Sequence, residues 1–123
     1  MKVLVTGATG FLGTHIVQRL QLDHTVVRLV RRGSPDGDVR GDVLDQSSLE
    51  AAFAGCDAVV HAAGAVSHRA ADAARMYDVH VLGAENVLAA ARAAGIRRLV
   101  HVGSSGTVAV SPEPGHVGTE TDP

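Results

Sequence analysis

The chain has 123 residues, a formal net charge of −2 and an aromatic content of 2%. This length predicts one domain with a single core. The balanced charge and the few aromatic side chains give no indication of a nucleic-acid partner or a membrane surface. The single cysteine, Cys56, excludes an intrachain disulfide and is typical of a reducing compartment. Because the chain also has no signal-peptide pattern and no apolar run of about 18 residues, we expect a soluble cytoplasmic domain.

A glycine-rich turn lies between the first predicted strand and the first predicted helix. The apolar run at 2–5 predicts a buried parallel strand, and apolar residues at helical spacing between Phe11 and Leu20 predict a helix. The turn between them is Thr6-Gly7-Ala8-Thr9-Gly10-Phe11-Leu12-Gly13. Glycines let a pyrophosphate approach closely, and the free N–H groups and dipole of a helix N-terminus favour the anion. The spacing Gly-x-x-Gly-x-x-Gly differs from the dehydrogenase fingerprint Gly-x-Gly-x-x-Gly, so a purely structural turn is the alternative.

The rest of the chain alternates predicted strands with predicted helices. Apolar and β-branched runs predict further strands at 25–30, 39–41, 58–63 and 99–102. Asp45 is a candidate N-cap for a helix that ends at Gly55, and helical periodicity covers 70–94. This order predicts a doubly wound α/β fold of Rossmann type with a parallel sheet. We expect a dinucleotide-binding domain at 1–110, truncated after its fifth strand, and a loop at 111–123.

Small or polar residues follow every predicted strand. In doubly wound sheets the ligand lies outside the carboxyl ends of the strands, where the strand order reverses. After the glycine turn of the first strand, these ends carry Arg31 and Arg32, then Asp42 and Val43, then Ala62-Ala63-Gly64, and finally Ser104 and Ser105. Together they predict a groove for an extended dinucleotide.

Arg31 and Arg32 indicate which dinucleotide the groove prefers. An NAD-selective site places Asp or Glu about 20 residues after the glycines, where the carboxylate accepts from the ribose 2′-hydroxyl. This chain has two arginines there, and guanidinium groups pair with the 2′-phosphate of NADP. We therefore predict a preference for NADP, with NAD as the alternative cofactor; ordinary solvated arginines are the alternative interpretation.

Three further positions have both a functional and a structural interpretation. Asp42 could accept from the adenine amino group with Val43 against the ring, or it could satisfy its own turn. Ser105 could hydrogen-bond a developing alkoxide, or it could satisfy backbone groups at the strand end. His61 is predicted to be a packed residue beside the cofactor. The seven histidines have no metal-ligand spacing, so no metal site is predicted, and no nucleophile elbow suggests hydrolysis.

Several motifs in order resemble the extended short-chain dehydrogenase/reductase family, also called NAD-dependent epimerase/dehydratases. They are the glycine turn, Gly41-Asp42-Val43-Leu44-Asp45, Asp57-Ala58-Val59-Val60-His61-Ala62-Ala63, Gly83-Ala84-Glu85-Asn86-Val87-Leu88-Ala89-Ala90-Ala91 and Gly95-Ile96-Arg97-Arg98-Leu99-Val100-His101-Val102-Gly103-Ser104-Ser105. The last motif, continued by Gly106-Thr107-Val108, and the basic end of the second strand are most similar to the dihydroflavonol-reductase-like branch, which uses NADPH. The resemblance implies a cofactor on the turn from Gly7 to Gly13, including Thr9, Gly10, Phe11 and Leu12, with adenine at Asp42 and Val43. It also implies that Ser105 is the catalytic serine.

The chain departs from the family pattern in its catalytic pair. The family transfers a proton through Tyr-x-x-x-Lys, but the only tyrosine here is Tyr77 and the only lysine is Lys2. In addition, His80 occupies a helix position where many members carry Asn. We therefore expect the cofactor-binding portion of a longer enzyme, which binds without turnover, is marginally stable or self-associating, and could form a homodimer.

Two other interpretations remain open. One is a non-catalytic NAD(P)-binding sensor or regulator of the same fold, and the other is a purely structural domain. The small-molecule substrate of the full-length protein cannot be deduced from this fold, and sugar nucleotide, flavonoid-like ketone and sterol all remain candidates.

Overall fold

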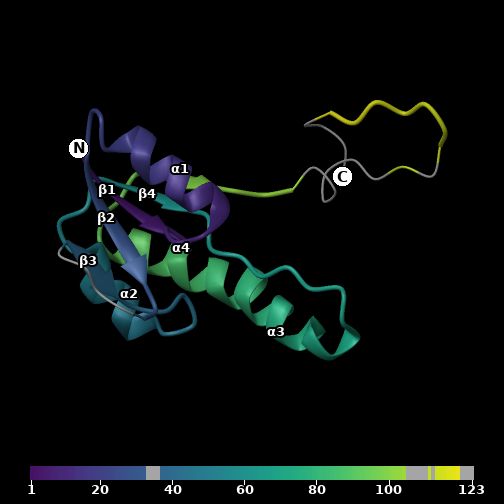
Figure 1. Cartoon of the computed structure of the whole chain (residues 1–123), viewed down its shortest axis with the longest axis horizontal. Helices are drawn as coiled ribbons and strands as arrows, with labels where there is room; N and C mark the ends of the chain where they lie inside the picture. Colours follow the sequence, from purple (N-terminus) through teal and green to yellow (C-terminus); the bar gives the residue numbers. More distant parts are fainter. Residues whose placement is uncertain (33–36, 105–110, 112, 120–123) are drawn as a thin grey trace.

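The computed structural model describes residues 1–32, 37–104, 111 and 113–119, and its central element is a parallel sheet (Figure 1). The five strands lie in the order β3-β2-β1-β4-β5, and every neighbouring pair is parallel. Their bounds are β1 Lys2–Thr6, β2 Thr25–Val30, β3 Asp38–Arg40, β4 Ala58–His61 and β5 Arg98–His101. The strand order reverses between β1 and β4, so the predicted doubly wound α/β fold is confirmed.

Helices cover both faces of the sheet (Figure 1). Helix α1 (Phe11–Leu20) lies on one face, and α2 (Gln46–Phe53) and α4 (Gly83–Ala93) lie side by side on the other. Because side chains alternate along a strand, neighbouring residues Leu4 and Val5 belong to two separate buried clusters. Leu4 packs with the α2 and α4 side, and Val5 packs with Val17 of α1.

Helix α2 begins where its sequence predicts. The Asp45 side chain accepts hydrogen bonds from the backbone N–H groups of Ser47 (3.1 Å) and Ser48 (3.3 Å), which satisfies donors of the first turn. Hydrogen bonds from Ser47 and Ser48 lower the pKa of the Asp45 carboxyl. Beyond the helix, Gly55 has a φ of 69°, a conformation that glycine adopts without strain. The predicted apolar stripe is buried at Leu49, Ala52 and Phe53.

The region 70–94 differs from the single periodic helix that the sequence predicts. It is divided into a 3₁₀ turn η1 (Ala70–Asp72), a short helix α3 (Ala73–Tyr77), a π-helical turn η2 (Asp78–Leu82) and then α4. A π turn changes the phase of the apolar stripe, so full burial begins only at Gly83. Ala94, which the periodicity places on the buried face, is exposed.

Thr6 and His61 form a buried polar contact between β1 and β4. The Thr6 hydroxyl lies 2.7 Å from Nδ1 of His61 and accepts the Ala63 N–H at 3.2 Å. The Nε2 atom of His61 is buried and has no hydrogen-bond partner in the described parts of the chain. Burial, reinforced by the nearby His101 and His80, lowers the pKa of His61 to about 4. His61 is thus a packed residue, as the sequence predicts.

We expect His61 to make the fold sensitive to acid. Between its ordinary pKa of 6.5 and about 4, the unfolded chain protonates His61 while the folded chain does not. The free energy of unfolding should therefore fall as the pH is lowered through this window, by up to roughly 3 kcal/mol. Urea unfolding at a series of pH values measures the loss.

Two variants separate His61 from the other titrating groups. His61→Phe should flatten the pH dependence because it removes the buried imidazole. His68→Gln, at an exposed histidine, should leave the dependence as in the wild type. An acid response that is identical in the wild type and His61→Phe would contradict the prediction.

Candidate cofactor-binding site

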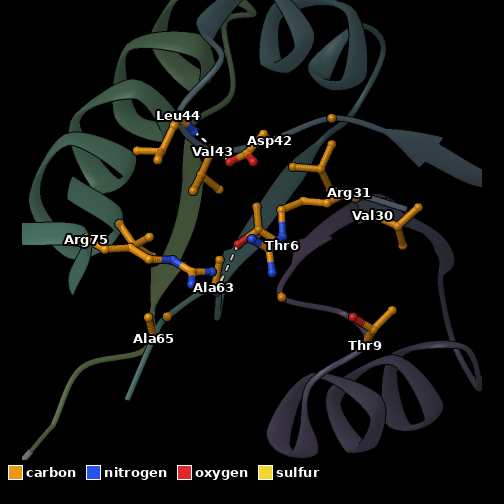
Figure 2. Close-up of a pocket in the computed structure, with 15 residues that line it drawn as sticks. Thr6, Thr9, Val30, Arg31, Asp42, Val43, Leu44, Ala63, Ala65 and Arg75 are labelled. Atoms are coloured by element: carbon orange, nitrogen blue, oxygen red, sulfur yellow. Dashed lines mark hydrogen bonds between the residues drawn. The ribbon is translucent and has the colours of Figure 1, made fainter. Parts of the chain in front are cut away.

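A pocket lies at the carboxyl ends of the strands, where the strand order reverses (Figure 2). Residues predicted from the sequence form much of its lining: Gly7, Thr9, Arg31, Asp42, Val43, Ala63 and Gly64. An adjoining pocket includes Arg32. The elements that meet here are the glycine turn, the ends of β2 and β3, the loop after β4, and the helical region around α3.

The glycine turn is packed so tightly that two of its glycines have no space for a side chain. Gly7 has a φ of 67°, and a Cβ atom there would lie 2.5 Å from the Ala62 carbonyl oxygen. A Cβ atom on Gly13 would lie 2.0 Å from the Gly7 carbonyl oxygen. Gly10 differs, because the nearest atom to its Cβ would be the Gly7 oxygen at 3.2 Å. Gly7 and Gly13 therefore shape the turn, and Gly10 leaves space in front of it.

The N-terminus of α1 is open to an anion. Its N-cap residue is Gly10, no side chain caps the helix, and its first turn contains no acidic residue. Phe11 is 87% exposed and Leu12 is 47% exposed, so the first turn faces outwards. N–H groups at such a helix start, together with the helix dipole, suit a pyrophosphate. The residues present thus fit the phosphate portion of a dinucleotide.

Asp42 and Val43 are held in place by a helix and by their own turn. Val43 is buried, and its carbonyl accepts a hydrogen bond from Nδ2 of Asn86 at 3.0 Å. Oδ1 of Asp42 accepts the Leu44 N–H at 3.0 Å, which is the self-satisfied turn that the sequence left as an alternative. Oδ2 of Asp42 has no hydrogen-bond partner in the described residues, so this carboxylate can still accept from a ligand.

The arginines after β2 carry no counter-charge of their own. Arg31 and Arg32 are exposed and have no ion-pair partner within the described residues. Arg28, in the middle of β2, is different: its guanidinium binds both carboxylate oxygens of Asp38 on β3, with a distance of 2.8 Å from Nη2 to Oδ2. Figure 2 shows that Arg31 extends into the pocket.

His80 supports the loop after β4. Its Nε2 atom lies 2.8 Å from the Ala65 carbonyl oxygen, and a Cβ atom on Gly64 would lie 3.0 Å from its Cε1. His80 comes from the π-helical turn η2, and this contact fixes the backbone of the Ala62-Ala63-Gly64 segment at the pocket wall.

Sequence reasoning missed the roles of Arg40, Arg75, His80 and Asn86. A signal existed for two of them: His80 and Asn86 lie three residues before and after Gly83, on the side of the helix that faces the strand ends. Arg40 lines the adjoining pocket, and Arg75 lines both pockets. Arg75 offered no signal, because no spacing in the sequence relates α3 to the ends of β2 and β3.

Some predictions lie beyond what the structure tests. Ser105, the candidate catalytic serine, lies outside the described residues. Within the described parts, no group of three or more His, Cys, Asp or Glu side chains could hold a metal ion. In the same parts, none of the helices has the length and apolar character that a membrane crossing requires.

The fold and the site define a class of protein. A parallel sheet in the order β3-β2-β1-β4-β5, with a glycine turn at the reversal of strand order, is the Rossmann-type arrangement. The family model for the NAD-dependent epimerase/dehydratase family matches residues 3–123. The chain belongs to this family.

Known relatives agree with this placement. The chain is 38% identical to the sterol demethylase protein B of Methylococcus capsulatus over 122 residues, which cover 92% of this chain and 37% of that protein. It is 35% identical over 115 residues to a Synechocystis protein that carries the name of a dihydroflavonol 4-reductase, with coverage of 86% and 33%.

A solved structure also matches. A short-chain dehydrogenase/reductase superfamily protein from Agrobacterium tumefaciens, determined with bound NAD, superposes with a TM-score of 0.78 at 39% identity. The match covers 88% of this chain and 34% of that one. The chain thus spans about a third of the length of these relatives.

Substitutions in the glycine turn should separate folding from binding. Gly13→Ala should lower the free energy of unfolding by at least about 2 kcal/mol, because its methyl group meets backbone atoms that cannot move aside. Gly10→Ala should keep most of the stability but weaken cofactor binding about tenfold, since its methyl group lies where a phosphate approaches. Urea unfolding and NADPH titration measure the two effects.

Gly103→Ala is the matched control, because no atom lies within 4 Å of its Cβ position. It should change neither quantity. Equal losses of stability in Gly10→Ala and Gly13→Ala would refute the division of roles within the turn.

Proposed function

We propose that this chain is the cofactor-binding portion of an NADP(H)-preferring oxidoreductase, epimerase or dehydratase that acts on a carbonyl or hydroxyl substrate. The observation that carries the cofactor preference is the pair Arg31 and Arg32 at the end of β2, in the place where an NAD-selective site has an acidic residue. Both guanidinium groups lack an ion-pair partner in the described residues, so they are free to bind a 2′-phosphate.

The proposed cofactor orientation assigns one wall of the groove to each part of the dinucleotide. The pyrophosphate lies against the glycine turn and the first turn of α1, where Gly10 leaves space and N–H groups are uncapped. Adenine lies at Asp42 and Val43. The segment Ala62-Ala63-Gly64 borders the rest of the cofactor, and when bound the cofactor supplies hydride transfer.

Catalysis is assigned to Ser105 by the resemblance to the family, as the residue that hydrogen-bonds the reacting oxygen. These 123 residues contain no Tyr-x-x-x-Lys, so we expect them to bind NADPH without turnover. The names of the relatives, a sterol demethylase protein and a dihydroflavonol 4-reductase, support a carbonyl or hydroxyl substrate. A cytoplasmic location is consistent with this proposal.

A non-catalytic NAD(P)-binding regulator of the same fold remains the second candidate. The coding sequence beyond Pro123 discriminates between the two. A Tyr-x-x-x-Lys within about 50 residues supports the enzyme, and a stop codon at that point supports the regulator.

The cofactor preference can be measured directly on the 123-residue chain. We expect NADPH to bind at least about tenfold more tightly than NADH, because one charge-assisted phosphate contact is worth about that factor. Arg31→Glu should remove or reverse the preference by repelling the 2′-phosphate. Isothermal titration calorimetry gives both dissociation constants.

Arg92→Gln, at an exposed arginine on α4 that lines neither pocket, is the control and should retain the preference. A wild-type chain that binds NADH as tightly as NADPH, or more tightly, would overturn the NADP assignment.

The outer face of α4 and β5 is expected to support self-association. Leu88 is 45% exposed beside an apolar groove that also includes Ala84, Leu99 and His101. Exposed apolar surface of this kind favours association at about 25 cal/mol per Å² buried. Leu88→Glu should shift the 123-residue chain towards the monomer in analytical ultracentrifugation, whereas Leu22→Glu, at an exposed leucine after α1, should not. A wild-type chain that is monomeric at all concentrations would contradict this expectation.

A further inference from the structure

Four arginines from three parts of the chain line one polar pocket beside the glycine turn. Arg31 and Arg32 follow β2, Arg40 ends β3, and Arg75 comes from α3. Only the first two were expected from the position that distinguishes NAD from NADP. Figure 2 shows Arg31 and Arg75 entering from opposite sides and pointing towards the same space.

The sheet register brings Arg40 next to Arg31. Val30 pairs with Arg40 across β2 and β3, and the Gly41 N–H donates to the Val30 carbonyl at 2.9 Å. The residue after Val30 is Arg31, so Arg31 and Arg40 lie one position apart at the ends of two neighbouring strands, and both line the same pocket.

The charge in this pocket is unbalanced. None of the four guanidinium groups has an ion-pair partner in the parts of the chain that the structure describes. Asp42 is the one carboxylate among the residues that line the pocket, and one of its oxygens is already used by its own turn. Arg28 is paired with Asp38 a short distance back along the same strands, so the chain neutralises an arginine where it does not face the pocket.

Clustered guanidinium groups without counter-charge repel one another, and an anion that reaches several of them relieves this repulsion. The anion must reach Thr9 in the glycine turn and the ends of β2 and β3 at once. The 2′-phosphate of an adenosine whose pyrophosphate lies on the glycine turn meets this requirement. A dinucleotide that has only its pyrophosphate, without a 2′-phosphate, would not require the arginines that line this pocket.

We propose that Arg40 and Arg75 are specificity-determining residues that bind the 2′-phosphate of NADP(H) together with Arg31 and Arg32. This inference rests on the proposed function, because it assigns further ligands to the same phosphate. The phosphate is then held from β3 and from α3 as well as from the end of β2.

The test compares two cofactors that differ only by this phosphate. Arg40→Gln and Arg75→Gln should each raise the dissociation constant for NADPH about tenfold while leaving that for NADH within about twofold. Binding of 2′-AMP should weaken in parallel, and binding of 5′-AMP should not change. Arg92→Gln should behave as the wild type, and thermal melting should show that every variant remains folded.

The outcomes separate this inference from the proposed function. If the wild type has no preference for NADPH, the proposed function fails and this inference fails with it. If the wild type prefers NADPH and Arg31→Glu abolishes the preference, but Arg40→Gln and Arg75→Gln retain it, only this inference is overturned. Equal weakening of NADPH and NADH would place these arginines on the shared pyrophosphate and would also overturn it. Arg75→Lys, which keeps the charge but loses the bidentate fork, should fall between the wild type and Arg75→Gln.

Discussion

The close approach of the glycine turn to the end of β4 is the constraint on which the rest of the site depends. Gly7 has a positive φ and no room for a Cβ atom against the Ala62 carbonyl, and Gly13 has none against Gly7 itself. This contact brings β1 and β4 together where the strand order reverses, and the Thr6 hydroxyl extends it by accepting the Ala63 N–H. The groove forms because the backbone of the glycine turn packs directly against the backbone after β4, with no side chain between the two segments.

The far wall of the groove is built by the helical region around Gly83. The absence of a side chain at Gly83 lets α4 approach Val43, where a Cβ atom would lie 3.0 Å from the Val43 Cγ2. Asn86 and His80, on either side of Gly83, then bind the backbone at Val43 and at Ala65. A π-helical turn precedes α4, and Arg75, in the short helix α3 before that turn, lines the same pocket as the arginines after β2. A local departure from α-helical geometry at a site of this kind is common where function constrains the backbone.

Much of the fold and about half of the site could be predicted from sequence. The second strand, the Asp45 cap and the buried stripe of α2 follow from local pattern, because they depend on neighbouring residues and a repeating period. The division of 70–94 was missed because a π turn has no compositional signature. The predicted positions Gly83, Val87 and Ala90 are buried, and Ala94 is exposed because helix α4 ends at Ala93. Ser105 stays a prediction, because it lies outside the described residues.

The sequence by itself determined the class of the protein: strands alternating with helices, glycines at the first turn, and arginines where an acidic residue would select NAD. Each of these is a statement about residues close together in the chain, so local physical chemistry is sufficient to interpret it. Only the tertiary structure decided that Arg40 and Arg75 face the same space as Arg31, and that His80 and Asn86 hold the opposite wall. The reason is that these side chains come from separate strands and helices, which only the packing of the whole fold brings together.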